Sequence, residues 1–272
     1  MTRTNMRDLT AAEGRHAFGA DAANYDAARP PYPAWVFERL QGICGLKHGT
    51  RTFEIGPGTG LATARLLELG AAPLVAIEPD ARLAAFLAAK LERDRLRVLN
   101  AAFEDTALEP ASFDLGTAAT SFHWMDQRAA LAKVARVLRP GGWWAAWWNV
   151  FGDPERKDDF HDATDVLLNG LANTPSHHAG QAHPFALDRT ARLADLQSVV
   201  EFDSVECEIQ RWTPTLTTAQ TRALYATYSQ FSVLEPRERE RLLDELARIA
   251  ETQFAGRVER NMCTVLYTAR RR

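Results

Sequence analysis

Short apolar segments alternate with helical stripes between about residue 50 and residue 150. Five segments have the length and composition of buried strands, at 53–55, 74–78, 96–99, 113–119 and 143–149. Between them, apolar side chains recur at the helical spacing of three and four residues, as in Ala84, Leu87, Ala88 and Leu91. Strands that alternate with helices predict a parallel sheet covered by helices on both faces.

The last of these segments carries four tryptophans in two adjacent pairs. In a strand, Trp143 and Trp147 point to one face of the sheet, and Trp144 and Trp148 point to the other. Large apolar side chains on both sides are typical of a strand that is buried on both faces. The Arg-Pro-Gly-Gly sequence at 139–142 predicts a tight turn before this strand.

The regions outside this alternating core have different patterns. Residues 1–32 are polar and alanine-rich, which predicts a mobile arm or short helix before a helix at 34–41. Residues 151–200 are polar, contain a helical stretch at 160–171 and show no clear strand. The remaining elements are predicted as a strand at 202–212, helices at 217–228 and 236–254, and a last strand at 258–268.

These patterns divide the chain into four parts. They are an N-terminal lid and helix at 1–45, an α/β core at 46–150, an inserted helical cap at 151–200, and a segment that completes the sheet at 201–272. The expected fold is a doubly wound α/β sheet of seven strands, mostly parallel with an antiparallel last strand at the edge.

Composition and charge narrow the possible partners. The 272 residues are 46% hydrophobic and 25% charged, as in an ordinary soluble globular protein. With 32 basic and 35 acidic residues, the net charge of −3 gives no general attraction to nucleic acid or acidic membranes. The basic triplet at 270–272 is expected to be a solvated terminus.

The three cysteines and the length of the apolar segments indicate in which cellular compartment the protein is expected. Cys44, Cys207 and Cys263 are odd in number and scattered, which favours free thiols in a reducing compartment. The N-terminus lacks the apolar core of a signal peptide, and no apolar run has the length of a membrane span. We therefore predict a cytoplasmic protein with no membrane partner.

A glycine-rich loop follows the first strand and precedes a helix that starts near Leu61. The loop is Gly56-Pro57-Gly58-Thr59-Gly60. Glycines permit positive φ and leave bare backbone, and the first turn of a helix offers unpaired N–H groups. Glu78 ends the next strand, 22 residues after Gly56, where a carboxylate can accept hydrogen bonds from both hydroxyls of a ribose. Together these features predict a nucleotide-sized binding site.

The chain at this point resembles the class I S-adenosylmethionine (SAM)-dependent methyltransferases, which have a Rossmann-like fold. Residues 53–60 look like the first motif of that family and residues 75–80 like its second. Residues 101–105 are similar to the loop at the adenine edge, and residues 138–142 to the turn before the fifth strand. The resemblance covers residues 18–150 well and the C-terminal part more loosely.

The resemblance implies SAM as the cofactor and a set of residues that bind it. These are Glu54, Gly56, Pro57, Gly58, Thr59, Gly60, Glu78, Pro79, Phe103, Glu104 and Thr120. The glycines would face the methionine part, Glu78 the ribose, and Phe103 and Glu104 the adenine. The adenine loop often has an acid at the position of Ala102, so this chain departs from the family there.

The N-terminal segment 25–33 resembles a lid that covers the cofactor in part of the family. Tyr25 and Arg29 would belong to the cofactor site, and Arg29 could bind the methionine carboxylate in a bidentate pair. The alternative is a surface arginine beside a proline corner. Tyr32 is expected at the substrate pocket.

Residues 120–126 follow the fourth strand and should lie close to the transferred methyl group. His123 is the candidate catalytic residue, because an imidazole can take a proton from a hydroxyl or an amine. The alternative is a packed histidine at a helix start. Phe122, Trp124, Trp148 and Tyr228 are candidates for an apolar substrate pocket, although aromatic residues in a sheet are more often core.

The four histidines at 161, 177, 178 and 183 raise the possibility of a metal site. Their spacing matches no common ligand pattern and no cysteine lies near, so we expect solvated histidines and no metal.

The sequence thus predicts a SAM-dependent methyltransferase that acts on a small molecule, with an oxygen, nitrogen or carbon acceptor. The alternatives are a non-catalytic SAM-binding regulatory protein and an NAD-dependent dehydrogenase. RNA methylation is disfavoured because the chain is acidic and has no basic stripe. The oligomeric state is left open.

Overall fold

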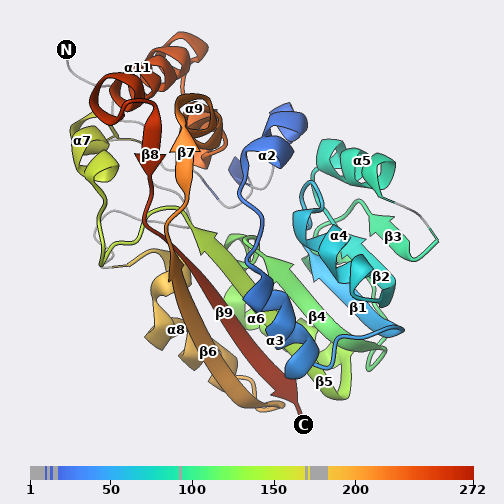
Figure 1. The fold of residues 1–272 in the computed structure, drawn as a ribbon. Helices are drawn as coiled ribbons and strands as arrows, with labels where there is room; N and C mark the ends of the chain where they lie inside the picture. The colour runs from blue at the N-terminus through green and yellow to red at the C-terminus, as the bar shows by residue number, and fades with distance from the viewer. Residues whose placement is uncertain (1–9, 11–12, 15–17, 92–93, 169–170, 172–182) are drawn as a thin grey trace.

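A seven-stranded sheet forms the centre of the protein in the computed structural model, which describes residues 10, 13–14, 18–91, 94–168, 171 and 183–272. Its strand order is β3-β2-β1-β4-β5-β9-β6 (Figure 1). The strands are β1 (Thr50–Ile55), β2 (Ala71–Ile77), β3 (Leu96–Leu99), β4 (Phe113–Ala119), β5 (Leu138–Val150), β6 (Phe202–Trp212) and β9 (Met262–Arg271). β9 runs antiparallel to β5 and β6, and the other pairs are parallel. The predicted fold class is confirmed.

The predicted turn at 139–142 is an irregularity inside a longer strand. β5 begins at Leu138, and its pairing with β4 jumps from Phe113↔Leu138 to Leu115↔Trp143. The extra residues of β5 include Gly141, whose φ of +79° lies in the left-handed region. Such a bulge bends the strand but leaves it in the sheet.

Helices cover both faces of the sheet and create two separate cores. One core unites Val36 of α3 with Leu66 of α4, Leu87 of α5 and Trp147. The other joins α6 and α8 to Trp144 and Trp148. The predicted alternation of the tryptophans is therefore confirmed. The covering helices are α3 (Ala34–Gly42), α4 (Leu61–Glu68), α5 (Ala81–Lys90), α6 (Gln127–Val137) and α8 (Arg189–Gln197).

A third apolar cluster lies beyond one end of the sheet, where α7, α9, α11, β7 and β8 gather (Figure 1). The elements there are α7 (Asp159–Leu168), β7 (Thr215–Thr217), α9 (Thr218–Ala226), α10 (Ser229–Ser232), α11 (Pro236–Phe254) and β8 (Arg257–Glu259). Leu216 of β7 belongs to a small separate cluster with Leu224 and Met262. Phe160 and Phe231 are fully buried in the third cluster. The apolar packing thus joins segments on both sides of residue 200. The expected last strand at 258–268 is divided into β8 and β9.

Short elements place the N-terminal segment and three loops. η1 (Gly19–Asp21) leads into α2 (Ala22–Ala28), which packs against α5 and α9 and lies between them in Figure 1. The other short helices are η2 (Phe103–Asp105), η3 (Phe122–Trp124) and η4 (Phe185–Leu187). Among the described residues, no helix is both long and apolar enough to cross a bilayer.

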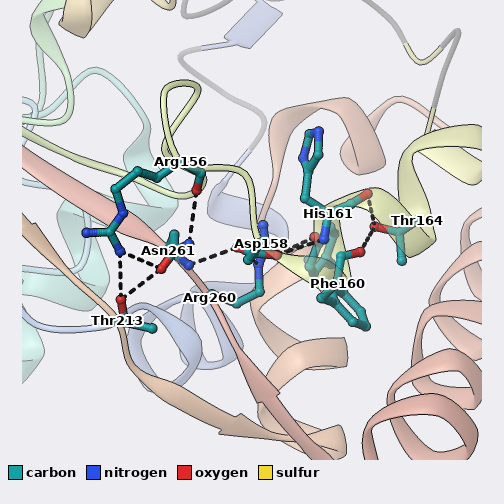
Figure 2. A network of polar contacts seen from close by, with 9 residues as sticks. Arg156, Asp158, Phe160, His161, Thr164, Thr213, Arg260 and Asn261 are labelled. Atoms are coloured by element: carbon teal, nitrogen blue, oxygen red, sulfur yellow. Dashed lines mark hydrogen bonds and ion pairs between the residues drawn. The ribbon is translucent and has the colours of Figure 1, made fainter.

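A buried ion pair ties the start of α7 to the link between β8 and β9 (Figure 2). Arg260 Nε donates to Asp158 Oδ2 at 3.0 Å, and its Nη1 donates to the hydroxyl of Tyr225 on α9. Asp158 also accepts from the backbone N–H groups of His161, at 2.7 Å, and Asn261, at 2.8 Å. The side chains of Arg260 and Asp158 are only 2% and 8% exposed. This network fixes the third cluster relative to the sheet.

We expect Arg260→Met to lower the free energy of unfolding by roughly 3–5 kcal/mol, because it leaves the buried Asp158 carboxylate without its cation. Urea denaturation measures the change. Arg241→Met is the matched control, since its pair with Glu238 is exposed and such pairs contribute about 1 kcal/mol or less. Similar small effects for both variants would contradict a structural role of the buried pair.

Candidate functional site

The glycine loop connects β1 to α4 and presents bare backbone at the end of the sheet. Gly56 and Gly58 have φ angles of +63° and +59°, which favour glycine. A Cβ on Gly56 would lie 2.6 Å from the Cβ of Ser121, whereas a Cβ on Gly58 would enter open space. Side chains are therefore excluded at Gly56 by a neighbour, and at Gly58 they would fill the space where a ligand can lie.

Glu78 lies at the carboxyl end of β2 and faces this loop. Its Oε2 accepts from Gly58 N–H and its Oε1 from Asp80 N–H, both at 3.0 Å. The side chain is almost completely buried, and burial raises its pKa to about 7 despite these two hydrogen bonds. A ligand that donates further hydrogen bonds would favour the carboxylate.

Glu54 lies on β1, fully buried beneath the loop. Thr63 Oγ1 donates to its Oε2 at 2.7 Å, and burial raises its pKa to about 7. In the described part of the chain, Glu54 Oε1 and Thr59 Oγ1 are buried and lack a hydrogen-bond partner. Unpaired buried polar atoms are costly, so these two atoms are suited to hydrogen-bond a polar ligand.

The loop at η2 is held by a lysine that sequence reasoning missed. Lys133 of α6 donates to the carbonyl oxygens of Phe103, Glu104, at 2.9 Å, and Thr106, at 2.6 Å. Its ammonium also lies 4.8 Å from the centroid of the Phe103 ring. Burial lowers the pKa of this lysine. No spacing in the sequence marks Lys133, because its partners are carbonyl groups, which every residue has.

A first cavity lies between these elements. Its lining includes Tyr25, Arg29, Tyr32, Gly56, Pro57, Gly58, Thr59, Glu78, Pro79, Phe103, Glu104, Thr120 and Trp124. The structure thus brings together most of the residues that the sequence predicted for the cofactor. Glu54 lies below this lining, and Gly60 caps α4 instead of lining the cavity.

A second, larger cavity adjoins the first. The two cavities share Phe18, Tyr25, Arg29, Thr120, Trp124, Asn149 and Phe151 as lining residues. The second cavity extends to His123, Trp148, Phe185 and Tyr228. Phe18, Asn149, Phe151 and Phe185 were not predicted as site residues, because their chain segments meet only in the folded protein.

Arg29 lies where the two cavities meet. Its Nε donates to Thr227 Oγ1 and its Nη2 to the Thr227 carbonyl oxygen, both at 2.9 Å. The guanidinium carbon is 4.8 Å from the ring centroid of Tyr25, 4.7 Å from Phe151 and 5.8 Å from Tyr228. It is therefore an ordered part of the site and not a free surface arginine. Tyr32, a predicted pocket residue, donates to Thr120 Oγ1 at 3.1 Å.

His123 is buried at the wall of the second cavity. Trp148 Nε1 donates to His123 Nδ1 at 3.0 Å. An indole nitrogen can only donate, so the proton of the neutral imidazole is on Nε2. Burial, together with the charge of Arg29, lowers the pKa of His123 to about 3. At neutral pH this side chain can donate a hydrogen bond into the cavity but is a poor proton acceptor.

The remaining predicted pocket residues differ in their positions. Trp124 lines both cavities, and Trp148 and Tyr228 line the second. Phe122 lines neither; it is 2% exposed and packs against Trp144, with ring centroids 4.9 Å apart. A pocket role for Phe122 is therefore not supported, because its side chain points into the core under the sheet.

The described histidines of the cap do not cluster. His161 lines the second cavity with its Nε2 3.8 Å from Asp165 Oδ1, and His183 is exposed. His177 and His178 lie outside the described residues. Within those residues, no group of three or more His, Cys, Asp or Glu side chains could hold a metal ion.

Known proteins that resemble this chain are methyltransferases. A family model described as a methyltransferase domain matches residues 53–146, which contain the glycine loop, Glu78, Phe103 and His123. A solved structure titled as a putative type II methyltransferase from Anaeromyxobacter dehalogenans has a similar fold, with a TM-score of 0.59 at 22% identity. It covers 89% of this chain and 97% of that one.

Three relatives are described as uncharacterized methyltransferases. An uncharacterized methyltransferase of Schizosaccharomyces pombe is 25% identical over 93% of this chain and 96% of its own length. One of Geobacillus kaustophilus is 31% identical over 54% of this chain and 76% of its own length. One of Mycobacterium tuberculosis is 35% identical over 134 residues, and the chain spans about half of its length, 52%.

The family model and these relatives agree with the motifs, the sheet topology and the cavity at its edge. The chain therefore belongs to the class I SAM-dependent methyltransferases.

Proposed function

We propose that this enzyme binds SAM in the first cavity and a small-molecule acceptor in the second, and transfers the methyl group where the two cavities meet. The observation that carries this proposal is the shared wall at Arg29, Thr120 and Asn149, which places two binding spaces in direct contact. Transfer between two bound molecules requires such contact, and much of the rate can come from positioning.

The residues of the first cavity fit SAM. The unpartnered Glu54 Oε1 suits the cationic amino group of a methionine moiety, and Glu78 has lone pairs left for ribose hydroxyls. The open space beside Gly58 leaves room for the ligand against bare backbone. Phe103 and Glu104 line the cavity beside Pro79, where an adenine would lie. SAM supplies an electrophilic methyl group on a sulfonium.

The second cavity favours an enzyme over a non-catalytic SAM-binding protein. A regulatory protein would need only the first cavity, whereas here a larger, aromatic-lined space adjoins it. The N-terminal segment that carries Tyr25 and Arg29 borders both cavities, as expected of a lid that excludes water from both ligands. The net charge of −3 favours a small molecule over nucleic acid.

Calorimetric titration with SAM and with NAD tests the cofactor, and incubation with methyl-labelled SAM and a small-molecule extract tests transfer. We expect SAM to bind and a label to appear in one or more small molecules. Binding of NAD in place of SAM would favour a dehydrogenase. SAM binding without any labelled product would favour a regulatory protein.

The proposed location is the cytoplasm, on the basis of Cys44, Cys207 and Cys263, all of which are free thiols. A reducing compartment would keep them in this state.

The affinity for SAM should increase as the pH rises through about 7. Burial raises the pKa of Glu78 to about 7, and ribose hydroxyls favour its ionised form, so binding at neutral pH releases a proton. Calorimetry at pH 6 and pH 8 measures this change. The same raised pKa lowers the stability of the free protein as the pH rises from 4.5 to about 7, because the unfolded chain loses its proton first.

Two variants separate the contributions to this pH dependence. Glu78→Gln and Glu54→Gln should each remove part of the change, since burial also raises the pKa of Glu54 to about 7. An affinity that decreases from pH 6 to pH 8 in the wild type would contradict the proposed roles of both acids.

Lys133→Met should weaken SAM binding about tenfold, equivalent to about 1.4 kcal/mol, because the loop of Phe103 and Glu104 loses its common donor. Calorimetry measures the dissociation constant. Arg128→Met, at an exposed position on the same helix, is the control and should bind SAM like the wild type. Equal affinities of all three proteins would exclude this positioning role.

The His123 imidazole should stay neutral, with its proton on Nε2, throughout pH 5–8. Nitrogen NMR of histidine-labelled protein distinguishes the two tautomers, and His123→Gln identifies the resonance. A titration midpoint near the ordinary value of about 6.5 would restore the predicted role as a base. If the imidazole shows no such midpoint, His123 acts as a hydrogen-bond donor.

A further inference from the structure

Seven of the residues that line the second cavity carry a Phe, Tyr or Trp ring. Trp148 is fixed by its hydrogen bond to His123 and lies 5.8 Å from Phe185 between ring centroids. Phe151 and Tyr228 face each other across 5.9 Å at an interplanar angle of 27°. Flat, rigid walls of this kind favour a planar ligand that can stack on them.

The charges around this cavity disfavour a cationic acceptor. Aromatic faces can bind an ammonium group, but here the Arg29 guanidinium already lies over Tyr25 and Phe151. No carboxylate of the described residues pairs with Arg29. Of the two lining carboxylates, Asp153 binds Arg211 at 2.8 Å and Asp165 faces His161. The guanidinium where the cavities meet therefore has no carboxylate of the described residues paired with it, and Lys157 lies farther along the wall of the second cavity.

Two hydrogen-bond donors of this wall, and the Nε2 of His161, have no hydrogen-bond partner in the described part of the chain. The Tyr228 hydroxyl is buried without a partner, and His123 has its Nδ1 occupied by Trp148, so that Nε2–H is left as a donor. Both groups can donate to an oxygen atom. The same geometry removes His123 as a base, because the only nitrogen of its neutral imidazole that could accept a proton already accepts from Trp148. The Nε2 of His161, the other imidazole of this wall, lies 3.8 Å from Asp165 Oδ1.

Without a base at His123, the acceptor that reacts most directly is one that arrives without a proton to lose. We propose, on the basis of the function proposed above, that the acceptor is a planar, conjugated small molecule that reacts through an oxygen anion, a phenolate or an enolate, beside Arg29. A bond forms between this oxygen and the methyl carbon while the carbon–sulfur bond breaks, and its electron pair stays on sulfur. The anion and the sulfonium become a neutral ether and a neutral thioether, with no proton transferred.

This proposal assigns Arg29 to the acceptor and not to the methionine carboxylate. The guanidinium is held by Thr227, adjacent in sequence to Tyr228, and stacks on walls of the second cavity. Two of its five N–H groups are used in the contacts to Thr227, so others are left for an anionic oxygen.

The probe 4-nitrophenol tests the proposal, because its anion absorbs visible light and its neutral form does not. It is titrated with the full-length protein saturated with S-adenosylhomocysteine (SAH), which has no sulfonium charge, at a pH where half of the free probe is ionised. We expect the nitrophenolate absorption to increase on binding. Arg29→Met should abolish this increase while SAH still binds, and Tyr228→Phe should weaken probe binding roughly tenfold.

Two probes of similar shape serve as matched comparisons. We expect 4-nitrobenzyl alcohol, whose hydroxyl is not acidic, and benzylamine, a cation, to bind at least tenfold more weakly than 4-nitrophenol by calorimetry. Val233→Ala is the control variant, since Val233 is exposed and is not a lining residue of either cavity. It should behave like the wild type with every probe.

The outcomes separate this inference from the proposed function. Unchanged or decreased nitrophenolate absorption, no binding of 4-nitrophenol, or equal or tighter binding of benzylamine would overturn the inference while SAM binding stands. A large loss of SAH affinity in Arg29→Met would show that Arg29 binds the cofactor. This result would also overturn the inference. Failure of the wild type to bind SAM or SAH would instead overturn the proposed function.

Discussion

The positions of β1 and β4 side by side in the sheet determine where ligands can bind. Both strands run in the same direction, but α4 follows β1 onto one face and α6 is packed on the other face after β4. The segments that follow the two strands therefore diverge at the carboxyl ends and leave a crevice between them, as in other doubly wound sheets. The glycine loop and Thr120 border this crevice from the two strands.

The buried acids at this crevice cost free energy, because an ionised carboxylate is less stable in the protein interior than in water. Glu54 and Glu78 are both buried, and burial raises the pKa of each to about 7. Backbone amides and Thr63 offset only part of this cost. A ligand that brings hydroxyl or ammonium donors can recover it, so the polar part of the fold is complementary to a molecule of that chemistry.

The second cavity depends on segments far apart in the sequence. α2 and its C-terminal cap bring Tyr25 and Arg29, the end of β5 and the residue after it bring Asn149 and Phe151, and the third cluster brings Tyr228. Arg260 and Asp158 hold this cluster in place through one buried ion pair (Figure 2). His123 contributes to the same wall, but its bond to Trp148 makes it a donor.

The sequence by itself determined the sheet, its helices and the cofactor loops, because periodicity and glycine spacing are local signals. Residues 53–60, Glu78 and Phe103 each follow a strand, and parallel strands bring such residues to one edge. Only the tertiary structure decided the hydrogen bonds from Lys133 to the loop of Phe103, the tautomer of His123 and the core position of Phe122. These depend on contacts between distant segments, such as Trp148 with His123, and no local pattern encodes which side chain a fold places opposite another.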